Sequence, residues 1–130
     1  MFVFSCNSDN KEFLSLNTFP ENSSESFLLS TNDNLYISWT EQVADSNFLY
    51  LSKLENNTWS EKSIIKKGTD WFVNWADFPS VIGLNGAPVA AHWLDKVPGS
   101  PYSYHVTIQP IEDQDWSQKS VSYTHLRAHE

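Results

Sequence analysis

Arginine is almost missing from this sequence, with one example, Arg127, in 130 residues. Lysine and arginine together number 8 against 16 aspartates and glutamates, which gives a net charge of −8. A protein that binds nucleic acid needs clustered basic side chains to neutralise several phosphates, whereas the lysines here are few and scattered. The sequence therefore predicts no nucleic-acid partner. Its scattered acidic residues are typical of an ordinary solvated surface.

Cysteine is equally scarce, because Cys6 is the only one. A single cysteine excludes a disulfide within the chain and a cysteine-based zinc site. The run FVFSC before the polar NSDNKE resembles the end of a bacterial lipoprotein signal, which implies lipidation of Cys6 and a lipid-anchored protein of the bacterial cell envelope, in the outer membrane or periplasm. Since only five residues precede Cys6 and a signal needs a longer apolar core, this interpretation requires that Met1 is not the true start or that the gene model is clipped. A free thiol in a frayed terminus is the alternative.

The last ten residues, VSYTHLRAHE (121–130), resemble the translation of a common transposase-type sequencing adaptor. We therefore expect this segment to carry no function. This interpretation removes Arg127, His125 and His129 from the candidate site residues. It also implies that the natural chain continues differently after Ser120.

Short apolar runs of four to eight residues begin at Phe27 and alternate with turn-forming residues. The runs FLLS, NLYISW, NFLYLSKL and WSEKSII are separated by TNDN, VADS and ENN. This spacing predicts a four-stranded antiparallel meander. Within the second run Leu35, Ile37 and Trp39 alternate with Tyr36 and Ser38, as the two faces of a strand require.

The pattern then repeats. The segment Ser26–Trp39 superposes without a gap on Ser80–Trp93, an offset of 54 residues, and WSEK at 59–62 recurs as WSQK with an offset of 57. We expect the three extra residues in the loop DKVPGSP, residues 95–101. A repeat of about 50 residues built from four strands is typical of a β-propeller blade.

The predicted fold is therefore all-β, a partial β-propeller with about two four-stranded antiparallel blades. Its parts are a signal remnant and linker at 1–25, a first blade at 26–68, a second blade at 69–120 and the adaptor-like tail at 121–130. A blade needs neighbours on both faces. Four or five large side chains left bare on each outer face forgo on the order of 10 kcal/mol of burial, so we expect a marginal or aggregation-prone fragment.

The end of the first predicted blade carries a recognisable turn sequence. SKLENNTW, residues 52–59, resembles a degenerate copy of the S-x-D-x-G-x-T-W turn, or Asp box, of sialidases and related propellers. Ser52, Thr58 and Trp59 match, Leu54 replaces the aspartate, and Asn56 replaces the glycine while tolerating a left-handed turn. With the repeat and the strings VNWADFPS and AHWLDK, the chain resembles sialidase-like bacterial lipoproteins. The resemblance implies six blades, a full-length monomer and Asp boxes that are structural.

The resemblance places function at the central mouth of the propeller, lined by TDWFVNWADFPS (69–80) and HWLDKVPGSPYSYH (92–105). Aromatic rings beside carboxylate and amide groups suit sugars. The candidate substrate-binding residues are Trp71, Asn74, Trp75 and His92, and Asp77 is the candidate catalytic acid. Three alternatives stay open: the aromatic rings wedge the blades together, Asp77 caps the turn before Pro79, and His92 is structural.

Two functions follow as expectations. The first is hydrolysis of terminal sugars by a sialidase-like enzyme, and the second is a non-catalytic surface propeller that binds a glycan or a protein. Sialidases grip a carboxylate with clustered arginines, and no arginine precedes Ser120, which counts against the first. His92 and His105 are the only histidines outside the tail, so we predict no metal and no cofactor.

Overall fold

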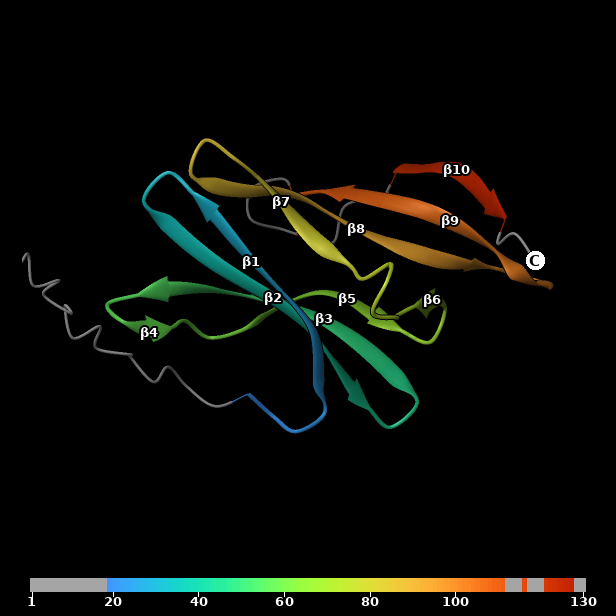
Figure 1. Cartoon of the computed structure of the whole chain (residues 1–130), viewed down its shortest axis with the longest axis horizontal. Coiled ribbons are helices and arrows are strands. Elements are labelled where there is room, and N and C mark those ends of the chain that lie inside the picture. Colours follow the sequence, from blue (N-terminus) through green and yellow to red (C-terminus); the bar gives the residue numbers. More distant parts are fainter. Residues whose placement is uncertain (1–18, 112–115, 117–120, 128–130) are drawn as a thin grey trace, which may run out of the picture.

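The computed structural model describes residues 19–111, residue 116 and residues 121–127, and it is built of strands in two antiparallel sheets. The first sheet has the order β1-β2-β3-β5, and the short β4 pairs with the far end of β3 (Figure 1). Its strands are β1 (Ser23–Thr31), β2 (Asn34–Val43), β3 (Ser46–Glu55), β4 (Thr58–Trp59) and β5 (Ser63–Gly68).

The second sheet repeats this plan with the order β7-β8-β9-β10. An extra strand, β6, pairs with β8 just beyond the start of β7. Its strands are β6 (Trp71–Phe72), β7 (Ser80–Leu84), β8 (Ala87–Val97), β9 (Ser100–Pro110) and β10 (Val121–Arg127). The all-β, antiparallel fold predicted from the sequence is thus confirmed.

Strand β10 consists of residues that the sequence analysis assigned to a translated adaptor. It lies along the free edge of β9, from Val121 opposite Ile108 to Arg127 opposite Ser103, with a register shift between Tyr123 and His125. The backbone groups of an edge strand pair with almost any extended segment. The pairing therefore leaves the adaptor interpretation a prediction.

The hairpin turns are formed by residues that accept a left-handed backbone. Asn56 (φ 50°) and Asn57 (φ 62°) join β3 to β4, and Asn85 (φ 51°) with Gly86 (φ 87°) joins β7 to β8. Two consecutive residues with positive φ are typical of the tight turn that suits twisted antiparallel strands. The predicted left-handed turn at Asn56 is confirmed.

The strand register relates the two sheets. Trp39 lies opposite Tyr50 in the first sheet, and Trp93 lies opposite Thr107 in the second. The two tryptophans are 54 residues apart and their two partners are 57 apart, so three residues are added in the second hairpin. Only one of the three extra residues, Pro101, lies in the predicted loop 95–101. The register jumps from Lys96 opposite Tyr104 to Val97 opposite Ser100, which places the extra residues at 101–103 within β9.

The gapless superposition of Ser26–Trp39 on Ser80–Trp93 is also wrong by one residue. Ile82 lies opposite Ala90 and Gly83 lies opposite Pro88, so Val89 is an extra residue in β8. A β-bulge of this kind inserts a residue without breaking the sheet. When positions are matched by strand pairing, Leu28 corresponds to Val81. Leu28 lies opposite the residue two before Trp39, and Val81 lies opposite the residue two before Trp93.

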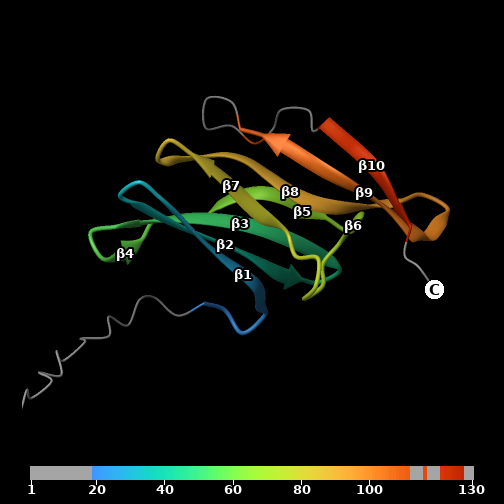
Figure 2. The same ribbon diagram turned by 45° about the horizontal axis from the view of Figure 1, so that its top comes forward.

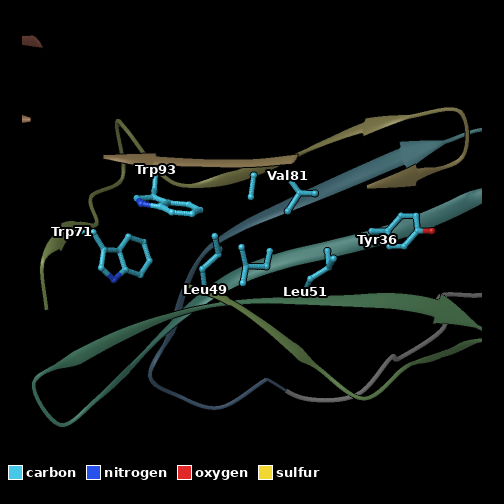
Figure 3. Packing of buried hydrophobic residues seen from close by; sticks show 8 residues of the cluster. Tyr36, Leu49, Leu51, Trp71, Val81 and Trp93 are labelled. Carbon is cyan, nitrogen blue, oxygen red and sulfur yellow. The ribbon is translucent and has the colours of Figure 1, made fainter. Parts of the chain in front are cut away.

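The sheets pack as two layers (Figure 2). Apolar side chains from both sheets form the core between them. In Figure 3, Val81 and Trp93 of the second sheet lie over Leu49 and Leu51 of the first. Leu49, Trp71, Val81 and Trp93 are nearly or fully buried. This burial is the main stabilising contribution of the pair of sheets.

Equivalent positions show which faces meet. In the first sheet, one face carries Leu29 and Leu51, and the other carries Leu28 and Trp39. We call them face A and face B, and we use the same names for the corresponding faces of the second sheet. Face A of the first sheet lies in the shared core. The second sheet contributes Val81 and Trp93 to that core, which correspond to Leu28 and Trp39 and so lie on its face B. The contact is therefore face A on face B.

Polar contacts tie the sheets together at both ends. At the turn end, Asn34 Nδ2 donates a hydrogen bond to the carbonyl of Gly86 at 2.8 Å, and the Gly86 amide donates one to Thr31 Oγ1 at 3.0 Å. At the opposite end, Lys66 Nζ lies 3.3 Å from Asp95 Oδ1. The relative position of the sheets is thus fixed by polar groups as well as by the core.

Candidate functional site

The connection after β5 and the β8–β9 hairpin lie together at one end of the sheets, as predicted from the sequence. Trp71 of β6 lies opposite Asp95 of β8. The Lys96 amide donates a hydrogen bond to the Asp70 carbonyl at 2.8 Å. The ring centroids of Phe72 and Tyr104 lie 4.9 Å apart. Both segments therefore contribute to one surface.

Between β6 and β7 the chain leaves the edge of β8 as the loop 73–79 and returns to the same edge. Asn74 organises this loop, because its Oδ1 accepts hydrogen bonds from the amides of Ala76 at 2.6 Å and Asp77 at 2.7 Å. Its Nδ2 lies 3.4 Å from Asp77 Oδ2. Asn74 thus forms an Asx turn that places Asp77, rather than facing a ligand on its own.

A pocket of about 410 Å³ lies beneath this loop, at the edge of β8 between β6 and β7. It is built from the loop, from β8 and β9 of the second sheet, and from β1 of the first. The lining residues are Phe27, Ala76, Asp77, Phe78, Ser80, His92, Trp93, Leu94 and Val106. Two of the predicted site residues, Asp77 and His92, therefore line one pocket with aromatic walls.

His92 holds the polar centre of the pocket. Its Nε2 lies 2.7 Å from Ser80 Oγ, directly across the β7–β8 pair. Partial burial lowers the pKa of His92 below its ordinary value of 6.5, because the charged ring loses hydration. A neutral imidazole carries one donor and one acceptor nitrogen, so it can bond both Ser80 and a ligand hydroxyl.

The two predicted tryptophans have opposite environments. Trp71 is fully buried in the core, and its Nε1 donates a hydrogen bond to the Gly68 carbonyl at 3.1 Å. Its ring fills the packing role that the sequence analysis left open, and no face of it is accessible to a sugar. Trp75 is 83% exposed on the loop. Only the second indole presents a face for stacking.

Phe27, Ser80 and Trp93 are among the lining residues that were not predicted as site residues. Ser80 and Trp93 lie in the segments 69–80 and 92–105 that were predicted to line the site, and Phe27 does not. Phe27 comes from the first sheet, and its ring lies 6.4 Å from that of Phe78. No local signal links residues 51 positions apart, since the contact depends on how the two sheets pack. Ser80 had a usable signal, because a strand that starts at residue 80 pairs Ser80 with His92 in the predicted hairpin.

A second hollow of about 640 Å³ opens beside the first segment of this surface. It is lined by Phe72, Lys96, Val97, Gly99, Ser100 and Tyr104. Its single cation, Lys96, donates a hydrogen bond to the Thr69 carbonyl at 3.0 Å. The hollow thus combines two aromatic rings with the polar groups of Lys96 and Ser100.

The Asp-box-like turn lies at the opposite end of the sheets from this surface. Ser52 Oγ donates a hydrogen bond to the Ser60 carbonyl at 2.7 Å, and Trp59 packs against the cluster that contains Trp39 and Tyr50. These contacts hold the β3–β4 hairpin on face B. The turn is placed to stabilise the sheet, away from the pocket.

In the described part of the chain, no three histidine, cysteine, aspartate or glutamate side chains gather in a way that could hold a metal ion. Among the same residues, no helix is long and apolar enough to cross a membrane. Cys6, the predicted lipidation site, lies outside the described residues. Comparison of the chain with protein-family models, curated proteins and solved structures finds no match.

Proposed function

We propose that the chain contributes two successive blades to a sialidase-like β-propeller, and that the pocket beneath the loop 73–79 binds a glycan. The A-on-B packing supports the first part, because repeat units that follow one another around an axis meet through opposite faces. Strand orders that match between the sheets support it further. Six blades in the complete propeller are the number that the resemblance implies.

One observation carries the glycan assignment: Asp77 and His92 converge in a pocket walled by Trp93, Phe27 and Phe78. A carboxylate accepts hydrogen bonds from sugar hydroxyls, a neutral imidazole both accepts and donates, and aromatic rings pack on the apolar C–H faces of the sugar. The exposed indole of Trp75 lies on the same loop and extends this surface.

The second candidate is hydrolysis of the bound glycan, with Asp77 as general acid. Its support is the position of the Asp77 carboxylate in the pocket lining. Glycosidases work with a second carboxylate, or a tyrosine assisted by glutamate, across the scissile bond. No such group lines this pocket among the described residues, so we propose binding first and hydrolysis second.

We further propose that Cys6 carries a lipid anchor and that the protein belongs to the bacterial cell envelope. The support is the apolar run before Cys6 and the polar run after it. Metabolic labelling with a palmitate analogue tests this directly. Label that is incorporated in the wild type and lost in Cys6→Ser supports the anchor, and label that is equal in both contradicts it.

A glycan array tests the binding proposal. We expect Asp77→Asn and Trp75→Ala each to weaken binding by about tenfold or more, since one removes a charge-assisted hydrogen bond and the other a stacking surface. Trp59→Phe, at the opposite end of the sheets, is the matched aromatic control and should bind as the wild type does. Hydrolysis is separated by incubating bound glycans and analysing the products. Absence of binding to any glycan by the folded wild type would refute the proposal.

A further inference from the structure

The outer face of the second sheet is apolar and exposed. Ile82 is 41% exposed and Ile108 is 37% exposed, although both belong to strands of a sheet whose other face is buried. In strand position they correspond to Leu29 and Leu51, which lie opposite Tyr36 and Ser38 on face A of the first sheet. There, the same positions are covered by the second sheet.

The outer face of the first sheet, face B, is also uncovered, although its counterpart in the second sheet is buried. Leu28 is 59% exposed on face B, and Ser30 beside it is also exposed. Their counterparts in the second sheet are Val81, which is buried in the core, and Gly83, which packs against Leu29. One molecule therefore contains a contact of face A on face B, plus one uncovered face of each kind.

We propose that this chain associates with further copies of itself head to tail, with face A of the second sheet of one copy on face B of the first sheet of the next. We infer a second copy as the partner because the contact between copies would repeat the contact within the molecule, with the same kinds of residue at equivalent positions. Such an interface is heterologous, since the two surfaces differ. The monomer predicted above has every blade in one chain, whereas this proposal concerns the two faces that the described sheets leave uncovered.

The docking area is the part of face B that β1 provides. The Phe19 ring packs edge-on against Trp39 at a centroid distance of 4.9 Å and covers that part of the face. Leu28 and Ser30 on β1 stay exposed. A copy that docks there buries Leu28 against Ile82 and its neighbours, which removes exposed apolar surface from water.

The internal contact also predicts which residues meet between copies. A Cβ atom built on Gly83 would lie 2.8 Å from Leu29 Cδ2, so these positions are direct neighbours across the internal interface. Ile82 corresponds to Leu29, and Ser30 corresponds to Gly83, since both are one pair away from their hairpin turn. In the proposed assembly, Ile82 of one copy therefore lies next to Ser30 of the next.

Cysteine cross-linking tests this register. We would place Ser30→Cys and Ile82→Cys together in a Cys6→Ser background and oxidise the protein mildly. The two sites lie on opposite outer faces of one molecule, so a disulfide between them joins two copies. We expect the double variant to give dimers and higher species on a non-reducing gel. Each single variant, oxidised on its own, should give none. Monomer alone from the double variant would overturn the proposed register.

Sedimentation velocity over a concentration series tests the association itself. We expect the wild type to associate, and Ile82→Glu to require at least tenfold higher concentration, because a charge would be buried at the contact. Val43→Glu is the control, since Val43 is equally exposed but lies at the end of β2. Circular dichroism would verify that both variants fold. A wild type that is monomeric throughout, or equal effects of both substitutions, would overturn the proposal. Because His92 and Val106 of the glycan pocket lie on face A together with Ile108, association covers the pocket, and glycan binding is measured at concentrations at which the chain is monomeric.

Discussion

Trp71 and Trp75 show how strongly the environment of a residue depends on its exact position in this loop. Trp71 is paired in β6 and lies in the core, whereas Trp75 is 83% exposed four residues later. The sequence places both in one aromatic cluster with Asn74 and Asp77, and it does not distinguish between them. The difference arises because β6 returns to the edge of β8 before the loop leaves it, which is a tertiary event.

We expect Trp71→Ala to lower the free energy of unfolding by about 3–5 kcal/mol, because it removes a fully buried ring. Trp75→Ala should change it by less than about 0.5 kcal/mol, since its side chain has little to lose on unfolding. Urea titration monitored by circular dichroism measures both. A large loss of stability in Trp75→Ala would show that this indole packs against the protein and would remove the stacking argument.

His92 predicts a pH dependence of stability. Because burial lowers the pKa of His92 in the folded chain below 6.5, the unfolded chain binds a proton more readily. The stability is therefore fully present above pH 6.5 and is lost as the pH falls from 6.5 towards the lower folded pKa. We expect His92→Gln to flatten this part of a melting-temperature profile. An unchanged slope in His92→Gln would mean that the ring is no less easily protonated in the fold.

At the scale of the elements, local sequence patterns predicted the strands and the turns well. Alternating residues and asparagine-rich turns are local signals, so β1 to β3 follow closely from the sequence. The run WSEKSII, predicted as one fourth strand, is divided into β4 and β5, which pair with different parts of β3. The insertion of three residues at the β8–β9 hairpin was predicted, but its exact place at 101–103 and the extra Val89 were not, because a bulge depends on how two strands pair. Asp77 and His92 were predicted as site residues, while Phe27 was not, because it reaches the pocket only through packing of the sheets.

A repeated polar contact also escaped the sequence analysis. Trp39 Nε1 donates a hydrogen bond to Glu41 at 2.8 Å, and Trp93 Nε1 donates one to Asp95 at 3.0 Å. Both pairs are two residues apart on face B, and each acid also meets a lysine, Lys62 or Lys66. The spacing of two residues between tryptophan and acid is visible in the sequence. Only the structure shows that each acid accepts the hydrogen bond of the indole on the same face of the strand.

The turn between β3 and β4 gives a prediction at this scale. Asn56 has a φ of 50°, a conformation that β-branched residues adopt poorly. We expect Asn56→Val to destabilise the fold by about 1–2 kcal/mol and Asn56→Gly to be close to neutral. Thermal unfolding of the two variants compares them. Equal melting temperatures for valine and glycine would show that the left-handed turn is not required.

At the scale of the whole molecule, two similar sheets meet through different faces and leave one face of each kind uncovered. The pocket lies at the edge where β6 and β7 leave a gap along β8, and it includes a residue of the first sheet. Binding at this pocket therefore depends on both sheets and on their relative position, which the Lys66–Asp95 ion pair at 3.3 Å helps to fix.

The central claim is that a glycan binds beneath the loop 73–79. The most direct measurement is a glycan titration followed by the indole N–H signals of the six tryptophans in ¹H–¹⁵N spectra, assigned with single Trp→Phe variants. We predict that the signals of Trp75 and Trp93 shift with increasing glycan, while that of Trp59 at the opposite end does not move. A glycan that binds while the Trp75 and Trp93 signals stay in place would contradict the account.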